Sequence, residues 1–307
     1  MTARWATTLF LLVLSAAVFC SLVGIAQLAP PLQIASAAAL IGVCIGSFAN
    51  VVIWRLPIML ERAWHDHVTD ECAANGHMKD GARPDQGRFN LAQPPSACPL
   101  CATPIACWHN VPILSYLWLR GRCAECQAGI SARYPIVEAA FGLAYGALGW
   151  HFGLSLELIA YAFFFSILAI LFAIDSDTQL LPDALTQPLL WTGLLVNAFG
   201  LHTSLEDALF GAVAGFLVFW LIAAGFKALH GKDGMGRGDL KLLAALGAWL
   251  GWQPLPFVMA IGASLSVLYI SVRVLTGQSK WSQPHAFGPH LILGGATMAV
   301  HGALFGV

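Results

Sequence analysis

Long apolar runs, separated by short polar stretches, dominate this chain. A membrane-spanning helix needs about 20 mostly apolar residues. Proline ends helices, so Pro30 and Pro31 separate the first two runs. The runs predict helices at about 5–29, 32–54, 135–152, 156–174, 184–200, 207–229, 240–255, 257–275 and 287–304. Those at 135–152 and 240–255 are short for membrane spans.

Composition indicates that lipid, rather than water, surrounds most of the chain. Hydrophobic residues fill 58% of the 307 positions and charged residues 10%, whereas an ordinary soluble domain carries about a quarter charged residues. The mean hydropathy is +0.72. The formal net charge of −1 gives no sign of a nucleic-acid partner. The expected fold is an all-α polytopic membrane protein with about eight or nine transmembrane helices and a small cytoplasmic zinc-binding domain.

The first apolar run, 5–29, has two interpretations. One arginine near the start, followed by a long apolar stretch, is typical of a signal peptide. The run is long for the core of a signal peptide, however, and no clean small-x-small cleavage site follows it. We therefore expect an uncleaved helix.

Basic residues predict the orientation of the chain in the membrane. Eight of the 15 Lys and Arg residues lie between Arg55 and Arg133, and a second cluster comprises Lys227, Lys232, Arg237 and Lys241. Cationic loops stay on the cytoplasmic side, so both regions should lie there. The chain then divides into N-terminal helices (1–54), a cytoplasmic domain (55–134) and a transmembrane core (135–307). The polar stretch 58–97 shows no sustained period and predicts a loop.

Four cysteines of this cytoplasmic domain form two C-x-x-C pairs, Cys98 with Cys101 and Cys123 with Cys126. The cytoplasm is reducing, which disfavours disulfides and favours a metal site. Four thiolates close a tetrahedral site around a structural Zn²⁺, which would tie together a polar domain that lacks a core of its own. The alternative is free thiols or redox pairs. Cys20, Cys44 and Cys107 are expected to act as small hydrophobic residues.

Two aspartates stand at helix ends on the predicted cytoplasmic face. Asp175 ends an apolar run, and Asp239 closes the glycine-rich stretch HGKDGMGRGD just before another run. Acidic residues at membrane borders are costly and therefore informative. Two neighbouring carboxylates cannot both ionise readily, so one keeps a proton. The ionised one can deprotonate a water and the other can protonate the carbonyl and leaving amine, which predicts peptide hydrolysis.

Neighbouring residues have structural as well as functional interpretations. Asp239 before a helix is also a candidate N-cap, and a tight turn alone is the structural interpretation of Gly236 and Gly238. Lys241 either orients a carboxylate or is an ordinary lysine of the cytoplasmic border. Asp183 is expected to be a structural acid in the first turn of a helix.

The motifs together resemble a known family. GRGD at 236–239 is similar to the signature of GxGD aspartyl proteases, and its surroundings resemble type IV prepilin peptidases. The similar segments are GSFANVVIWRLP (46–57), CPLC (98–101), WHNVPILSYLWLRGRCAEC (108–126), ISARYPIVE (130–138), DSDTQLLPDALTQPLLW (175–191), GMGRGDLKLLAALGAW (234–249) and FGP (287–289). The resemblance covers roughly 40–295. These motifs are specific jointly, whereas G-x-G-D alone is weak.

The resemblance implies a function and its residues. Asp175 and Asp239 would cleave the leader of membrane-inserted prepilins and pseudopilins after a glycine, at the cytoplasmic face of a bacterial inner membrane. Bifunctional members then methylate the new N-terminal residue with S-adenosylmethionine, and Gly121 occupies a position linked to that step. No free-standing methyltransferase motif is visible. The run 5–29 is additional to the family's usual eight spans.

Other functions account for fewer of these features. A transporter would carry acids near the middle of the bilayer and repeated halves, whereas these acids lie at one face and no repeat is visible. A non-catalytic zinc protein would keep the cysteines but would need no aspartate pair. A peptidase without methyltransferase activity remains open.

Overall fold

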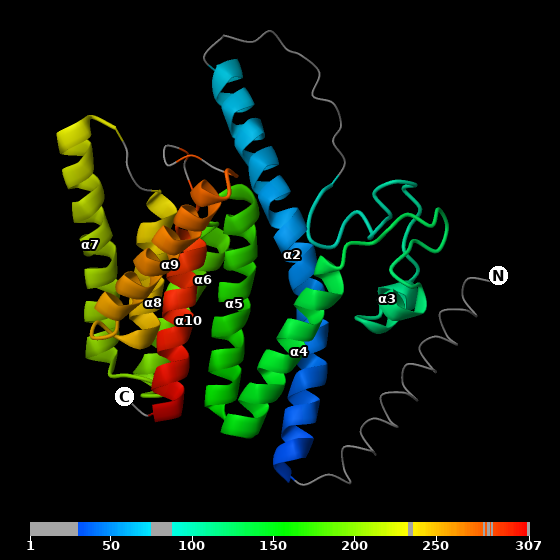
Figure 1. Ribbon diagram of the computed structural model, residues 1–307, viewed down its shortest axis with the longest axis horizontal. Coiled ribbons are helices and arrows are strands. Elements are labelled where there is room, and N and C mark those ends of the chain that lie inside the picture. Colours follow the sequence, from blue (N-terminus) through cyan, green and yellow to red (C-terminus); the bar gives the residue numbers. More distant parts are fainter. Residues whose placement is uncertain are drawn as a thin grey trace. The chain divides into compact units, whose positions relative to one another are not determined.

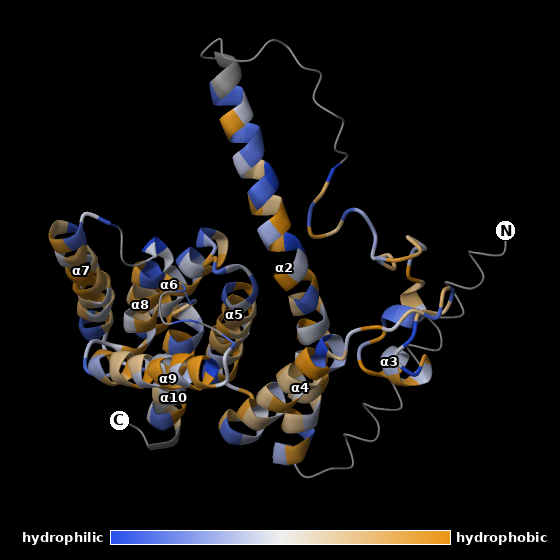
Figure 2. Cartoon of the chain, turned by 45° about the horizontal axis from the view of Figure 1, so that its top comes forward, coloured by the Kyte–Doolittle hydropathy of each residue, from blue (hydrophilic) through white to orange (hydrophobic). Residues whose placement is uncertain are grey.

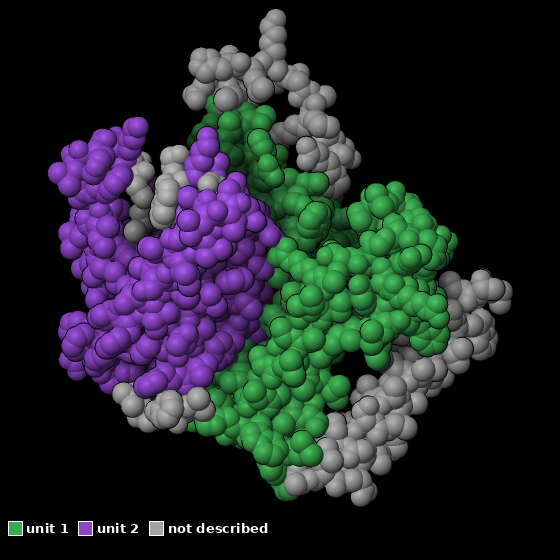
Figure 3. Space-filling view, viewed as in Figure 1, with its two compact units in different colours: residues 1–162 green, residues 163–307 purple. Residues whose placement is uncertain are grey.

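The computed structural model describes residues 30–74, 88–232, 236–278, 280, 283 and 285–305. The run 5–29, with Cys20 and the choice between signal peptide and uncleaved helix, lies outside the described residues. The chain forms two compact units, residues 1–162 and 163–307 (Figure 3).

Helices make up most of the described chain (Figure 1). Unit 1 contains α2 (Pro30–Ala74), the 3₁₀ helix η1 (Cys107–Asn110), α3 (Leu114–Trp118), α4 (Arg133–Phe152) and the start of α5 (Leu156–Thr178). Unit 2 contains the rest of α5, α6 (Asp183–Ala198), α7 (Leu205–His230), α8 (Arg237–Leu250), α9 (Leu255–Leu275) and α10 (Gly288–Phe305). Every predicted helix within the described residues is present. Four of them, α2, α5, α7 and α9, are long and apolar enough to cross a membrane, and the total of eight or nine spans stays a prediction.

The first part of the predicted loop 58–97 is wrong, because α2 continues to Ala74. Pro57 removes only one backbone donor, and the following residues include many good helix formers and no glycine or proline up to Ala74. His67 and Glu71 also form an i,i+4 pair, with Nδ1 and Oε1 3.6 Å apart. This end of α2 is largely hydrophilic (Figure 2). Its apolar residues Leu60, Trp64 and Val68 recur every four residues, but the polar residues between them hid this period.

In unit 1, α2 and α4 pack closely through small residues. A Cβ atom added at Gly46 would lie 2.9 Å from the Cα of Glu138, so the two helices leave no room for a side chain there. Asn50 on α2 donates from Nδ2 to the carbonyl of Tyr134 on α4 at 3.2 Å. Small residues that let helix backbones approach are typical of helix packing in membranes. These contacts determine how α2 and α4 are aligned along their axes.

In unit 2, α8 is the central helix, and its side chains from Leu242 to Leu250 are buried. Trp249 donates from Nε1 to the carbonyl of Leu189 on α6 at 2.7 Å, and Asn197 donates from Nδ2 to the carbonyl of Ala248 at 2.8 Å. Buried polar side chains need such partners. The far end of α8 is therefore fixed to α6, and its first turn carries Asp239.

Candidate active site and metal centre

Asp239 lies in the first turn of α8 rather than at its N-cap. Gly236 occupies the N-cap position and its carbonyl accepts from the Asp239 N–H at 3.3 Å. An acidic side chain in a first turn interacts favourably with the helix dipole. The capping interpretation of Asp239 therefore does not hold, and its carboxylate is left for other contacts.

Asp175 lies near the end of α5 and is only 4% exposed. Its Oδ2 atom is buried and has no hydrogen-bond partner among the described residues. The backbone N–H of Gly288 interacts with the same carboxylate. A side chain at Gly288 would press on this group, because an added Cβ would lie 3.1 Å from Asp175 Cγ. A buried oxygen without a partner is unusual in a native structure, and Asp175 also belongs to the lining of a cavity.

Asp175 and Asp239 line one cavity of about 380 Å³. Burial, and then the charge of Asp175, raise the pKa of Asp239 to about 7. The pair can therefore share one proton near neutral pH, as acid–base cleavage of a peptide needs. The lining residues are Asp175, Gln179, Leu180, Leu181, Gly236, Arg237, Gly238, Asp239, His285, Ala286 and Phe287.

Gly238 lets α8 approach the segment that follows α5. A Cβ atom added at Gly238 would lie 2.8 Å from Leu181 Cβ. At Gly236 an added Cβ would lie 3.5 Å from Asp239 Oδ2, which is ordinary van der Waals contact. Of the two signature glycines, Gly238 is the one whose missing side chain the packing requires.

Lys241 pairs with Asp183 rather than with either cavity aspartate. Its Nζ donates to both carboxylate oxygens, at 2.6 and 2.7 Å. Asp183 is the first residue of α6, as the sequence predicted. The pairing itself was missed, because nothing in the local sequence relates the two residues. His285 was also missed, whereas Phe287 belongs to the FGP motif.

Unit 1 holds the four-cysteine cluster. The Sγ atoms of Cys98, Cys101, Cys123 and Cys126 all lie within 4.8 Å of one another. The Sγ atoms of Cys98 and Cys126 are 3.7 Å apart, and a tetrahedral zinc with Zn–S bonds of about 2.3 Å requires about 3.8 Å. The donor set and its spacing therefore fit a structural zinc ion.

Two similar turns carry these cysteines. Ala102 donates to the carbonyl of Cys98 at 2.9 Å, and Gln127 donates to the carbonyl of Cys123 at 3.1 Å. Hydrogen bonds from the side chain and backbone of Thr103 lower the pKa of the Cys101 thiol to about 6. Since the thiolate is the form that binds metal, these hydrogen bonds favour ligation by Cys101.

Gly121 stands just before the second cysteine turn. Its φ of +68° lies in the left-handed region, which glycine adopts at no steric cost. A Cβ atom there would lie 2.9 Å from Cζ and Oη of Tyr116. Any other residue at 121 would disturb both the turn and the tyrosine.

Comparison with known proteins places both units in one family. Residues 40–152 match the bacterial peptidase A24 N-terminal domain, and residues 162–271 match the type IV leader peptidase family. No solved structure gives a significant match.

Similar curated proteins cover nearly the whole chain. A prepilin leader peptidase/N-methyltransferase of Stutzerimonas stutzeri is 45% identical over 265 residues, covering 86% of this chain and 90% of that protein. Proteins of the same name are 46% identical over 285 residues in Burkholderia pseudomallei (92% and 90% covered) and 44% identical over 269 residues in Pseudomonas aeruginosa (86% and 89% covered). With two aspartates facing one cavity and four cysteines in one cluster, this chain belongs to the type IV leader peptidase family.

Proposed function

We propose that this protein cleaves the leader peptide of type IV prepilins and pseudopilins and then methylates the new N-terminal residue. The observation that carries the proposal is the single cavity that Asp175 and Asp239 share. The same pair of activities stands in the name of the relatives that align over most of the chain. A peptidase without the methyl-transfer step is the second candidate.

The two aspartates divide the chemistry between them. Asp175, ionised, takes a proton from a water in the shared cavity, and the water attacks the scissile carbonyl. Asp239, with its raised pKa, holds the proton that goes to the carbonyl oxygen and then to the leaving amine.

Helix directions favour cleavage at one membrane border. The end of α5 and the starts of α6 and α8 lie at one end of unit 2, with the basic residues Lys227, Lys232, Arg237 and Lys241. Basic residues favour the cytoplasmic side. We therefore assign the cavity to the cytoplasmic face of a bacterial inner membrane, where it would meet the leader of a membrane-inserted prepilin helix.

Two further groups belong to the proposal. Cys98, Cys101, Cys123 and Cys126 would hold a structural Zn²⁺, which ties the loops around them together. S-adenosylmethionine would supply the methyl group as a co-substrate. Gly121 is the position at which we expect methyl transfer to be sensitive, by resemblance to the family.

The test uses the purified full-length protein in detergent or nanodiscs, a model prepilin and S-adenosylmethionine, with products followed by mass spectrometry. Asp175→Asn and Asp239→Asn should each abolish leader release, whereas a methyl mass on the mature product establishes the second activity. Asp177→Asn is the matched control, since Asp177 is an exposed acid in the same helical turn as Asp175. It should leave cleavage unchanged.

Two results would contradict the proposal. Wild-type rates in both aspartate variants would refute the catalytic pair. A correctly folded wild type that cuts no prepilin would refute the peptidase function itself.

A further inference from the structure

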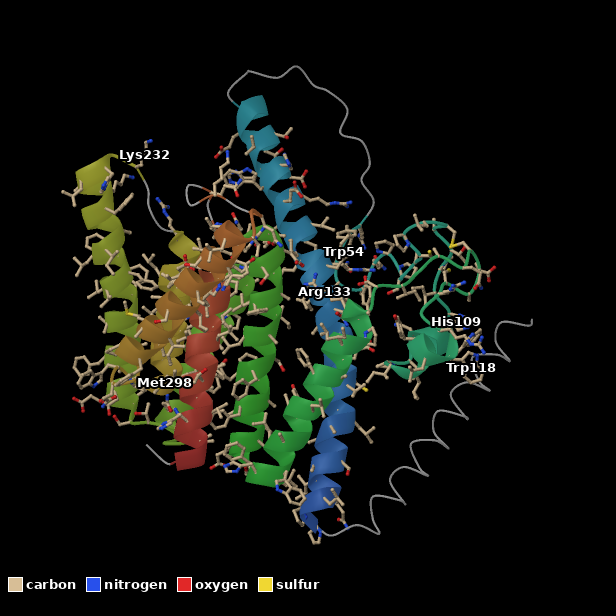
Figure 4. The ribbon with its side chains drawn as sticks, in the orientation of Figure 1. Trp54, His109, Trp118, Arg133, Lys232 and Met298 are labelled. Atoms are coloured by element: carbon tan, nitrogen blue, oxygen red, sulfur yellow. The ribbon has the colours of Figure 1, made fainter. Side chains whose placement is uncertain are left out.

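Residues 111–119 form an exposed apolar segment in the part of unit 1 between α2 and α4. The segment reads VPILSYLWL, contains α3 and carries no charged side chain. Leu114 is 66% exposed, Leu117 65% and Trp118 87%. Trp118 lies on the side of α3 away from α4 (Figure 4). Side chains of this kind gathered on one short helix are unfavourable in water.

A buried glutamate of α4 fixes the start of this segment. Glu138 is 7% exposed, and its Oε2 accepts from the backbone N–H of Ile113 at 2.7 Å. Ile113 has a φ of +59°, which is unfavourable for a β-branched residue. The hydrogen bond therefore holds a strained turn directly before α3, and α3 cannot move far from Glu138.

Glu138 also determines the position of α3 along the axes of α2 and α4. It packs against Gly46 in the apolar part of α2, where residues 30–54 carry no charge. Arg55 follows nine residues after Gly46, about 13 Å farther along the helix axis. Arg133 precedes Glu138 by five residues, about 7 Å along α4. The Glu138–Ile113 bond thus lies on the apolar side of both charged residues.

A second contact attaches the polar part of the same domain to α2, at the position of the charged residue Arg55. The guanidinium of Arg55 donates to the carbonyls of Asn90 at 2.9 Å and Pro94 at 2.7 Å. The domain is therefore attached at two positions along these helices. Arg55 on α2 holds it near the charged residues, and Glu138 on α4 holds it in the apolar part. In Figure 1, α3 lies below the loops that carry the cysteines, at the height of the first turns of α4.

From these anchors we propose that α3 and its flanks insert into the lipid interface as a membrane-embedded wedge. The helices that hold the wedge also carry exposed apolar side chains, among them Ile136 on α4 and Phe48 on α2. Trp and Tyr side chains favour the headgroup level. Arg120 and Arg122 follow directly and would meet anionic phosphates at the surface.

Photo-crosslinking in a bilayer tests the wedge directly. The full-length protein, in nanodiscs of phosphatidylethanolamine and phosphatidylglycerol, would carry p-benzoylphenylalanine at position 118. This aromatic replacement of an exposed tryptophan should leave folding intact, and bound zinc and circular dichroism check this. The matched control carries the same group at Glu125, an exposed position of the second cysteine turn.

Phospholipid adducts, read by mass spectrometry, should be at least about tenfold more frequent at 118 than at 125, since only the first is expected in contact with lipid tails. Equal adduct yields at the two positions would overturn the proposal. So would crosslinks from 118 chiefly to protein, including residues 5–29 of the same chain, because the occupant would then be a protein segment.

Discussion

Lys241 and Asp183 form a two-pronged ion pair that ties the first turn of α8 to the first residue of α6. The Nζ–O distances are 2.6 and 2.7 Å. Lys241 comes two residues after Asp239, and Asp183 follows directly on the segment 179–182, most of which lines the cavity. The pair lies outside the cavity lining, yet it joins two stretches that carry that lining. The ion pair can therefore affect the rate of cleavage only by positioning the two stretches that line the cavity.

We expect Lys241→Met to slow leader cleavage without unfolding the protein. The pair is partly exposed, so its loss should cost less than about 1 kcal/mol of stability. A small displacement of Asp239 should nevertheless lower kcat about three- to tenfold. Adding Asp183→Asn should cost nothing more, because both changes remove the same contact.

Kinetics and thermal denaturation of the two single variants and the double variant check this prediction. Glu71→Gln is the matched control, since it changes a surface contact away from the cavity, His67–Glu71 on α2. It should leave kcat unchanged. Additive losses in the double variant would show that Lys241 and Asp183 act separately.

The rate of leader cleavage should fall as the pH rises above neutrality. Burial, and then the charge of Asp175, raise the pKa of Asp239 to about 7. The protonated acid is the active form, so kcat/KM should fall about tenfold for each pH unit above that value. If Asp239→Glu keeps some activity, the pH at which its kcat/KM begins to fall should differ from that of the wild type. The pH profile of single-turnover cleavage is the measurement, and a rate that is flat from pH 6 to 9 would contradict the assignment.

The sequence was sufficient to predict most of the helices and the position of Asp175 and Asp239 at helix ends. Apolar runs define spans because the bilayer sets their length, and Asp175 and Asp239 stand where such runs begin or end. The polar half of α2 was missed, because its few apolar residues, Leu60, Trp64 and Val68, are separated by polar ones and give only a weak period. The contacts of Gly288 with Asp175 and of Lys241 with Asp183 were missed for another reason. They join residues far apart in the chain, and only packing reveals them.

Gly238→Ala should disable cleavage through a steric clash. The added Cβ would meet Leu181 Cβ at 2.8 Å, so either the first turn of α8 or the segment around Leu181 must shift. We expect a loss of more than about tenfold in kcat, since reacting groups tolerate little displacement. Combining it with Leu181→Ala should restore part of the activity. Gly225→Ala on α7 is the matched control, because nothing lies within 4 Å of its added Cβ. No rescue by Leu181→Ala would exclude the clash as the cause.

Cys123→Ser should remove zinc from the protein. One missing thiolate opens a site that needs four ligands, so the zinc content should fall from about one per chain to near zero. The loops of 88–133 should then become sensitive to limited proteolysis. Cys107→Ser is the matched control, since Cys107 lies outside the cluster. Metal analysis of both variants measures the zinc content per chain. Full zinc content in Cys123→Ser would refute the set of four cysteine ligands.

Gly121→Ala should separate the two proposed activities. Alanine at a φ of +68° costs about 1–2 kcal/mol, and its Cβ would lie 2.9 Å from Tyr116. The change disturbs the turn before Cys123, whereas Asp175 and Asp239 lie in unit 2. We therefore expect methylation of the cut product to fall more than about tenfold and cleavage to change less than about twofold, because only the turn at 121 is strained.

Gly129→Ala is the matched control for this effect. It lies in the same region, and its added Cβ would have nothing within 4 Å. It should leave both activities intact. Mass spectrometry of one reaction reports both activities, since the leader and the methyl group change the product mass separately. Equal losses of cleavage and methylation in Gly121→Ala would mean that this turn supports the whole enzyme rather than methyl transfer.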